Sequence, residues 1–144
     1  MKAKAFFEQV SRAAHDLKTV RAKLRRYRDM GYSISGGSMD SPVVSHSRGS
    51  SRVEASAIGM YETTREWEET EKRLASVIRE AEKVIEQIPQ QKFRDLLTYK
   101  YICGMSRKSI ADELEYKDER SVNRAHGFAL REAQKILNKA GDHQ

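Results

Sequence analysis

Two stretches of this chain repeat apolar residues at alternating spacings of four and three, and this periodicity constrains the fold most. The repeat averages 3.5 residues, so it lines one face of an α-helix and is typical of helices that pack along a seam. The sequence therefore predicts two long helices and an all-α protein. The first seam consists of Phe6, Val10, Ala13, Leu17, Val20, Leu24 and Tyr27, and the second of Met60, Thr64, Trp67, Glu71, Leu74, Ile78, Ala81, Ile85 and Ile88.

The two predicted helices carry opposite charge. Residues 1–30 hold nine Lys or Arg and three Asp or Glu, whereas residues 55–87 hold five and eight. This difference favours an antiparallel, coiled-coil-like hairpin in which the seams are buried and opposite charges flank them. A homodimer formed through the same seams fits the pattern equally. Glu71 interrupts the second seam, so either the helix bends there or its carboxylate finds a partner such as an arginine of the first helix.

The segment between the two seams has the composition of a linker. Eight of the 24 residues in 31–54 are Ser and four are Gly. Such a composition predicts a flexible connection between the two helices. We therefore expect a first domain over residues 1–88, with this linker inside it, and a second domain over residues 89–144.

In the last third of the chain the apolar-periodic segments are shorter and are separated by polar breaks, which predicts three helices after Pro89. The stretch "QQKFRDLLTYKYICG" is expected to form a helix that Gly104 closes. A short helix follows Ser106, and a long helix follows Asp118 and extends to Gly141; both Ser106 and Asp118 are suitable N-cap residues. The inward residues expected are Phe93, Leu96, Leu97 and Tyr101 in the first of these helices, and Ile110 and Leu114 in the second.

The final helix separates its residues into two faces. At 3.6 residues per turn, one face within roughly 60° is apolar and the face opposite it, within roughly 40°, is basic. The outward face also holds Gly127, which costs about 1 kcal/mol of helix propensity relative to Ala. A helix that presses against a groove wall has a use for this glycine, whereas a structural helix has little. The inward set is Val122, Ala125, Ala129, Ala133 and Ile136, and the outward set is Arg120, Arg124, Gly127 and Arg131.

A basic helix that follows a short helix and a brief turn is typical of DNA recognition, and the chain has a net charge of +6. Such a helix fits the major groove, where arginine donates two hydrogen bonds to guanine. Residues near its N-terminus usually contact the bases. The sequence thus nominates base readers at Arg120, Ser121, Asn123 and Arg124, and phosphate contacts at Ser106, Arg107, Lys108 and Arg131.

The stretch "IPQQKFRDLLTYKYICGMSRKSIADELEY", followed by "VNRAHGFAL", resembles region four of bacterial primary sigma factors, which is a helix-turn-helix. The chain is also similar to short phage-encoded proteins of Gram-positive hosts, related to transcriptional activators of the RinA and ArpU type. The N-terminal helix, the Ser/Gly stretch and the second helix fit the same group. The matching residues are Leu97, Tyr101, Ile102, Gly104, Ile110, Ala111, Leu114, Tyr116, Val122, Arg124, His126, Gly127, Ala129 and Leu130.

This resemblance implies a sequence-specific regulator of phage transcription that acts at late promoters with host RNA polymerase. It also implies double-stranded DNA as the partner and a location in the host bacterial cytoplasm, at the nucleoid. The sequence departs from the family at three points. Its turn "EYKDE" is one residue longer, Glu115 stands where glycine is typical, and Arg107 stands where an aromatic residue is common.

Other classes of function find little support in the sequence. The four histidines and Cys103 do not have the spacing of a zinc site, so we expect no metal and no cofactor. No nucleophile has an identifiable base beside it, so we expect no enzymatic activity. No run of about 18 apolar residues occurs, and the N-terminus lacks the apolar core of a signal peptide, so we expect no membrane association.

Two alternative functions stay open. A DNA-packaging protein of the small-terminase kind also joins a helix-turn-helix to helical oligomerisation segments, and a ring-sized assembly in solution would favour it. A module that docks on RNA polymerase without reading bases is the second alternative. A gel-shift experiment with promoter DNA, with and without polymerase, separates that case.

Overall fold

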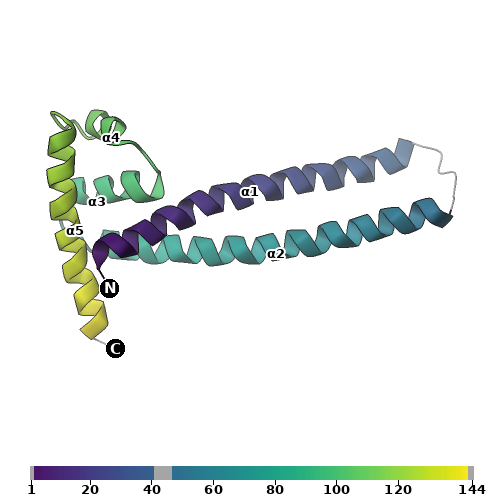
Figure 1. Ribbon diagram of the computed structural model, residues 1–144, viewed down its shortest axis with the longest axis horizontal. Helices are drawn as coiled ribbons and strands as arrows, with labels where there is room; N and C mark the ends of the chain where they lie inside the picture. The colour runs from purple at the N-terminus through teal and green to yellow at the C-terminus, as the bar shows by residue number, and fades with distance from the viewer. Residues whose placement is uncertain (1, 41–46, 143–144) are drawn as a thin grey trace. The chain divides into compact units, whose positions relative to one another are not determined.

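The computed structural model describes residues 2–40 and 47–142, and the side chains among these except those of 31–40, 47–57 and 142. Within these residues every regular element is helical, which confirms the all-α class (Figure 1). None of the described helices is both long and apolar enough to cross a membrane. In chain order the elements are α1 (Ala3–Asp40), α2 (Ser47–Glu86), α3 (Gln91–Leu97), the π-helix η1 (Thr98–Ile102), α4 (Arg107–Glu113) and α5 (Glu119–Asp142).

The Ser/Gly-rich segment differs from the sequence expectation. Helix α1 continues to Asp40 and α2 begins at Ser47, so residues 31–40 and 47–54 are helical rather than linker. Residues 41–46 lie outside the described residues. An established helix gains one hydrogen bond with each added residue, so serine and glycine, at up to about 1 kcal/mol each, weaken its extension without preventing it.

The chain divides into two compact units, and both long helices contribute to each of them. The first unit consists of Met1–Asp16 with Leu74–Gln144, and the second of Leu17–Arg73. The expected boundary between residues 88 and 89 stays a prediction, but one core in the first unit takes residues from both sides of it.

The core of the first unit joins α1, the end of α2 and all the later helices. Phe7 is fully buried, and its ring stacks on that of Tyr101 at 5.2 Å between centroids. The backbone N–H of Ala3 donates to Gln134 Oε1 at 2.6 Å. The first turns of α1 are thus fixed against η1 and α5. The buried core residues are Ala3, Phe7, Val10, Ala81, Ile85, Ile88, Leu96, Leu97, Tyr101, Ile110, Ala111, Val122, Ala125, Ala129 and Ala133.

In the second unit, α1 and α2 contact each other through an aromatic pair and a surface ion pair. The rings of Tyr27 and Trp67 meet edge to face at 4.7 Å, and Arg28 lies 3.4 Å from a carboxylate oxygen of Glu68. The ion pair is exposed, so it contributes at most about 1 kcal/mol. Glu71 is half-buried, and no ion pair among the described side chains includes it. Buried residues of the first seam here are Leu17, Val20 and Leu24.

Both predicted N-caps of the last third are confirmed. The backbone N–H of Ser109 donates to Ser106 Oγ at 3.2 Å at the start of α4, and that of Ser121 donates to Asp118 Oδ1 at 2.8 Å at the start of α5.

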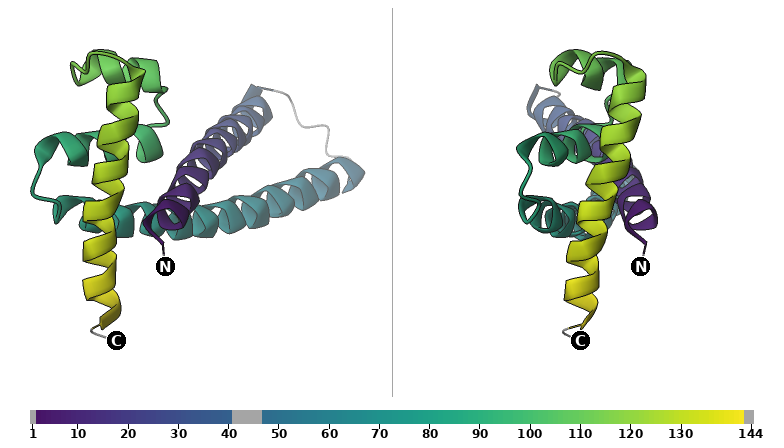
Figure 2. Two further views of the ribbon diagram at one scale, coloured as in Figure 1. Left: turned by 60° about the vertical axis from the view of Figure 1, so that its left-hand side comes forward. Right: turned by 90° about the vertical axis from the view of Figure 1, so that its left-hand side faces the viewer.

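Helix α3 continues into η1 instead of ending as one regular helix, and Gly104 then turns the chain with a φ of 69°. Figure 2 shows α4 beside the N-terminal end of α5 and α3 further along it.

Glu115 has a φ of 59°, a left-handed conformation that glycine adopts at little cost. We therefore expect Glu115→Gly to raise the free energy of unfolding by about 0.5–1 kcal/mol, since relief of about 1–2 kcal/mol of strain exceeds the extra entropy of the unfolded chain. Urea unfolding measures the change. Glu113→Gly, at the last residue of α4, should instead lower the stability, by less than the roughly 1 kcal/mol that glycine costs in a helix interior. Equal losses in both variants would contradict the left-handed turn.

Candidate nucleic-acid interface

Helix α5 has the two faces that its sequence predicts. The aliphatic stripe is turned into the core: Val122 is 1% exposed, and Ala129 and Ala133 are fully buried. The basic stripe, on the opposite side of the helix, is exposed. The exposed residues of this outward face are Arg120, Arg124, Gly127 and Arg131.

The N-terminus of α5 is fixed by Asp118, which receives hydrogen bonds from both the backbone and the hydroxyl of Ser121, each at 2.8 Å. These two hydrogen bonds, followed by the nearby Arg124 charge, hold the pKa of the Asp118 carboxyl below its usual value. Ser121 was nominated as a base reader. Its hydroxyl proton is used within the fold, so only its oxygen is left to accept a hydrogen bond from a base.

The phosphate contacts predicted near the start of α4 differ in whether the fold already uses their side chains. Ser106 caps the helix, and its hydroxyl also donates to Ser109 Oγ at 3.0 Å, so the fold already uses it. Arg107 and Lys108 are exposed and form no ion pair with another described residue. Their side chains therefore have the freedom that a phosphate contact requires.

The sequence reasoning missed one exposed aromatic residue of α5. Phe128 is 52% exposed, and the Arg131 guanidinium lies over its ring at 5.4 Å. Such a cation–π contact is worth roughly 0.5–1 kcal/mol at an exposed site and holds the arginine in place. The signal was available, because an aromatic residue directly after Gly127 falls outside the buried stripe.

Asn123 and Arg107 both line a pocket of about 510 Å³ in the first unit, whose lining includes neither Arg120 nor Arg124. His126 lines the same pocket and shares a hydrogen bond of 2.6 Å with the Tyr101 hydroxyl. Burial, then the charges of Lys100, Lys4 and Arg107, lowers the pKa of His126 to about 4. Burial and the charge of Glu8 raise the pKa of Tyr101 to about 12. Both side chains are therefore neutral at pH 7.

The lowered pKa of His126 should make the stability of the fold depend on pH. Because the folded pKa of His126 lies below its unfolded value of 6.5, the unfolded chain binds more protons between the two values. The stabilisation is complete above pH 6.5 and is lost as the pH falls towards 4. We expect a loss of about 1–2 kcal/mol over this window, since water screens the partly exposed ring. Unfolding at several pH values, compared with His126→Gln, measures it. A variant with the same slope as the parent would exclude His126 as its source.

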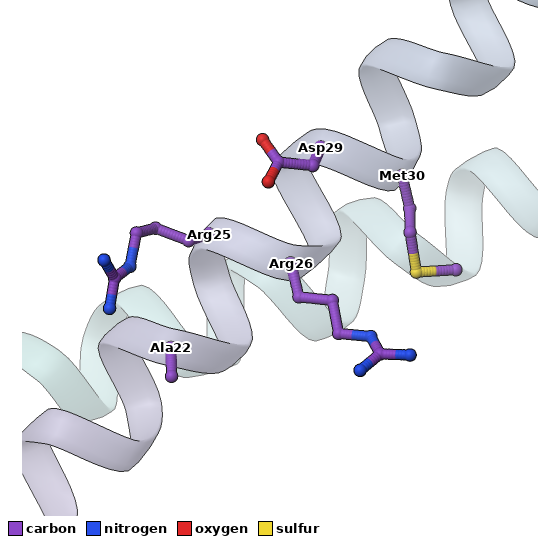
Figure 3. Close-up of a pocket in the computed structure, with 5 residues that line it drawn as sticks. All are labelled: Ala22, Arg25, Arg26, Asp29 and Met30. Carbon is purple, nitrogen blue, oxygen red and sulfur yellow. The ribbon is translucent and has the colours of Figure 1, made fainter.

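The second unit has a basic surface of its own along α1. A pocket of about 570 Å³ is lined by Ala22, Arg25, Arg26, Asp29 and Met30. Figure 3 shows these side chains on consecutive turns of α1, with Arg25 and Arg26 extending in different directions and a carboxylate among them. Met30 is 45% exposed. The mixed character of this surface gives it no defined ligand.

Across the part of the chain that the structure describes, no three His, Cys, Asp or Glu side chains lie close enough together to hold a metal ion. Cys103 is exposed and unpaired by any disulfide among these residues. Comparisons of the chain with protein-family models, curated proteins and solved structures find no match. The resemblance to sigma region four therefore stays a prediction that rests on the residues of this chain.

Proposed function

We propose that this chain is a sequence-specific DNA-binding protein that regulates transcription, with α4 and α5 as its helix-turn-helix. The observation that carries the proposal is the outward face of α5, where Arg120, Arg124 and Arg131 are exposed along one side while the opposite side is buried. The major groove of DNA is wide enough to accept an α-helix, and exposed arginines along one side of such a helix can donate hydrogen bonds to base edges and phosphates.

The contacts divide by position along α5. Arg120 and Arg124 lie in its first two turns, where they can reach base edges; Asn123, the residue before Arg124, lines the pocket that also contains Arg107. Arg131 is two turns further along and is suited to a phosphate, as are Arg107 and Lys108 at the start of α4. The phosphate contacts fix the position of the helix, and the first two turns read the sequence.

Gly127 supports the proposal because the fold does not require it. A Cβ built at this position meets no other side chain or element within 4 Å among the described residues, and the residue is exposed in the middle of α5. Glycine is the most costly residue in a helix interior apart from proline. Because glycine has no side chain, it allows the helix to approach a DNA backbone or groove wall closely.

We expect Gly127→Ala to have opposite effects on stability and binding. The free energy of unfolding should rise by about 1 kcal/mol, because alanine has the higher helix propensity and the Cβ enters open space. The affinity for duplex DNA should fall, because the new methyl group lies at the contact surface. Thermal unfolding and fluorescence anisotropy measure the two quantities. Gly141→Ala, near the end of α5, is the matched control and should leave DNA affinity unchanged; an equal affinity of both variants would remove Gly127 from the interface.

The wider setting is part of the same proposal. We propose that α1 and α2 form an antiparallel hairpin within the second unit. The Tyr27–Trp67 and Arg28–Glu68 contacts and the opposite charges of the two segments support this arrangement. The resemblance described for residues 88–130 supports action at phage promoters together with host RNA polymerase.

The test is selection of duplexes from a random pool by the full chain, followed by gel-shift assays of the enriched sequence. We expect one enriched motif and, with three phosphate contacts, an affinity that falls roughly 40-fold between 50 and 200 mM salt. Binding to RNA polymerase with no enriched motif would favour the docking module instead. A ring-sized assembly in solution would favour the packaging protein.

A further inference from the structure

A second polar site lies in the first unit, on a different side of α5 from the outward arginine face. It is the pocket of about 510 Å³ that contains Asn123 and His126. Four separate helices contribute to it, so its shape depends on the folded unit and not on one surface helix. Its lining residues are Lys4, Glu8, Ser11 and Arg12 of α1, Lys100 and Tyr101 of η1, Arg107 of α4, and Asn123 and His126 of α5.

The pocket concentrates positive charge. Four of its side chains are cationic, and Glu8 is its one carboxylate. None of the four cations forms an ion pair with a described residue. Burial, and then the charges of Arg107 and Lys4, lower the pKa of Lys100. An anion placed among them would relieve this repulsion.

The π-helix η1 supplies two of the residues that line the pocket, Lys100 and Tyr101. The backbone N–H of Cys103 donates to the Thr98 carbonyl at 3.0 Å, five residues back, and this wider turn contains Lys100 and Tyr101. Turns of this kind are frequent at functional sites. Lys100 Nζ lies 5.7 Å from the ring centroid of Tyr101, which faces the buried core with its ring and His126 with its hydroxyl.

We propose that this pocket binds a small phosphate-bearing anion of about nucleotide size. Lys4, Arg12, Lys100 and Arg107 would neutralise the phosphate groups, since arginine and lysine are the side chains that bind phosphate through charge-assisted hydrogen bonds. Asn123 supplies both a donor and an acceptor for the uncharged part of the ligand. The volume exceeds that of one inorganic phosphate, which is why a larger ligand is favoured.

Occupancy of this site would change the DNA-binding surface as well, because Arg107 and Asn123 belong to both. It would also raise the pKa of His126, since an anion offsets the Lys100, Lys4 and Arg107 charges that, with burial, lower it. Glu8 and Arg12 remain as the other charged groups of the pocket, and Tyr101 stays protonated. The ring resonances of His126 therefore report on binding without any DNA present.

The experiment is isothermal titration of the full chain, without DNA, with sodium pyrophosphate and with adenosine triphosphate at constant ionic strength. We expect one saturable site per chain, an affinity at least tenfold lower in both Lys100→Gln and Arg107→Gln, and an upward shift of the His126 pKa on binding. Lys135→Gln, an exposed lysine of α5 outside the pocket, is the control with the same loss of charge and should bind as the parent does.

Three outcomes would overturn the proposal. These are the absence of saturable binding, equal weakening by all three variants, and saturable binding that leaves the pKa of His126 unchanged. Lys100 is partly buried, so its variant is first checked for folding by circular dichroism; Arg107 is exposed, and its variant tests the site independently. Because no DNA is used, a failure here is distinct from a failure of the proposed DNA binding.

Discussion

Replacement of Phe7 by alanine should lower the free energy of unfolding of the first unit by about 3–5 kcal/mol. Phe7 is fully buried, its ring stacks on Tyr101 at 5.2 Å, and it meets Phe6 edge to face at 5.1 Å. Truncation removes these contacts and leaves a cavity that the surrounding helices fill only in part. Among the described residues, Phe7 is the largest side chain that is fully buried.

Hydrogen exchange of the α5 amides is the appropriate measurement, because the two compact units need not unfold in one step. Phe128→Ala is the matched control. Phe128 is 52% exposed, so its loss should change the stability by no more than about 0.5 kcal/mol. If Phe7→Ala costs no more than this control, the start of α1 is not part of the core, and residues 89–144 form the independent domain that the sequence suggests.

Replacement of Arg124 by alanine should weaken binding to the preferred duplex by about 1–3 kcal/mol, or about 5- to 150-fold. Arg124 is exposed in the second turn of α5, next to the capped N-terminus that enters the groove in the proposed function. The loss should be confined to one base step, since an arginine that forms two hydrogen bonds to guanine discriminates against the other bases there.

Fluorescence anisotropy with the selected duplex and its single-base variants measures this effect. Arg79→Ala, on the exposed side of α2, removes the same charge at a position with no proposed contact and should bind within about twofold of the parent. An Arg124→Ala protein that binds every duplex as the parent does would show that Arg124 reads no base. A uniform loss over all duplexes would make Arg124 a phosphate contact.

The orientation of α5 could be predicted because it depends on local periodicity. Val122, Ala125, Ala129 and Ala133 recur at the spacing of one helical face, and no alternative face of that helix is apolar. The caps at Ser106 and Asp118 were predictable for the same reason, since a cap satisfies backbone groups within three residues of itself.

The partner of the first seam could not be predicted. Its period predicts that one face of α1 is buried but does not specify what buries it. The predicted seam begins at Phe6, which is only partly buried, whereas its neighbour Phe7 is fully buried and contacts Tyr101, far away in the chain. The helical state of residues 31–40 and 47–54 was missed because composition measures the propensity of single residues, whereas a helix extends cooperatively.

The pocket beside Asn123 also had no signature in the sequence. Its cations come from three separate helices, and Lys100 reaches it from a π-helical turn whose wider spacing no heptad or 3.6-residue pattern anticipates. Only the candidate residues on one element, such as Arg120 and Arg124, could be grouped in advance, because their relative positions follow from a single helix.

The hydrogen bond between Ala3 and Gln134 joins residues that are 131 positions apart in the chain. The first unit therefore cannot be completed until nearly the whole chain has been synthesised. During synthesis the core that buries Ala3, Phe7 and Val10 cannot be completed until α5 has left the ribosome. Contacts of such long range slow folding, since the intervening chain must first be brought into a closed loop. Until then the apolar residues at the start of α1 lack part of the core that buries them in the folded unit.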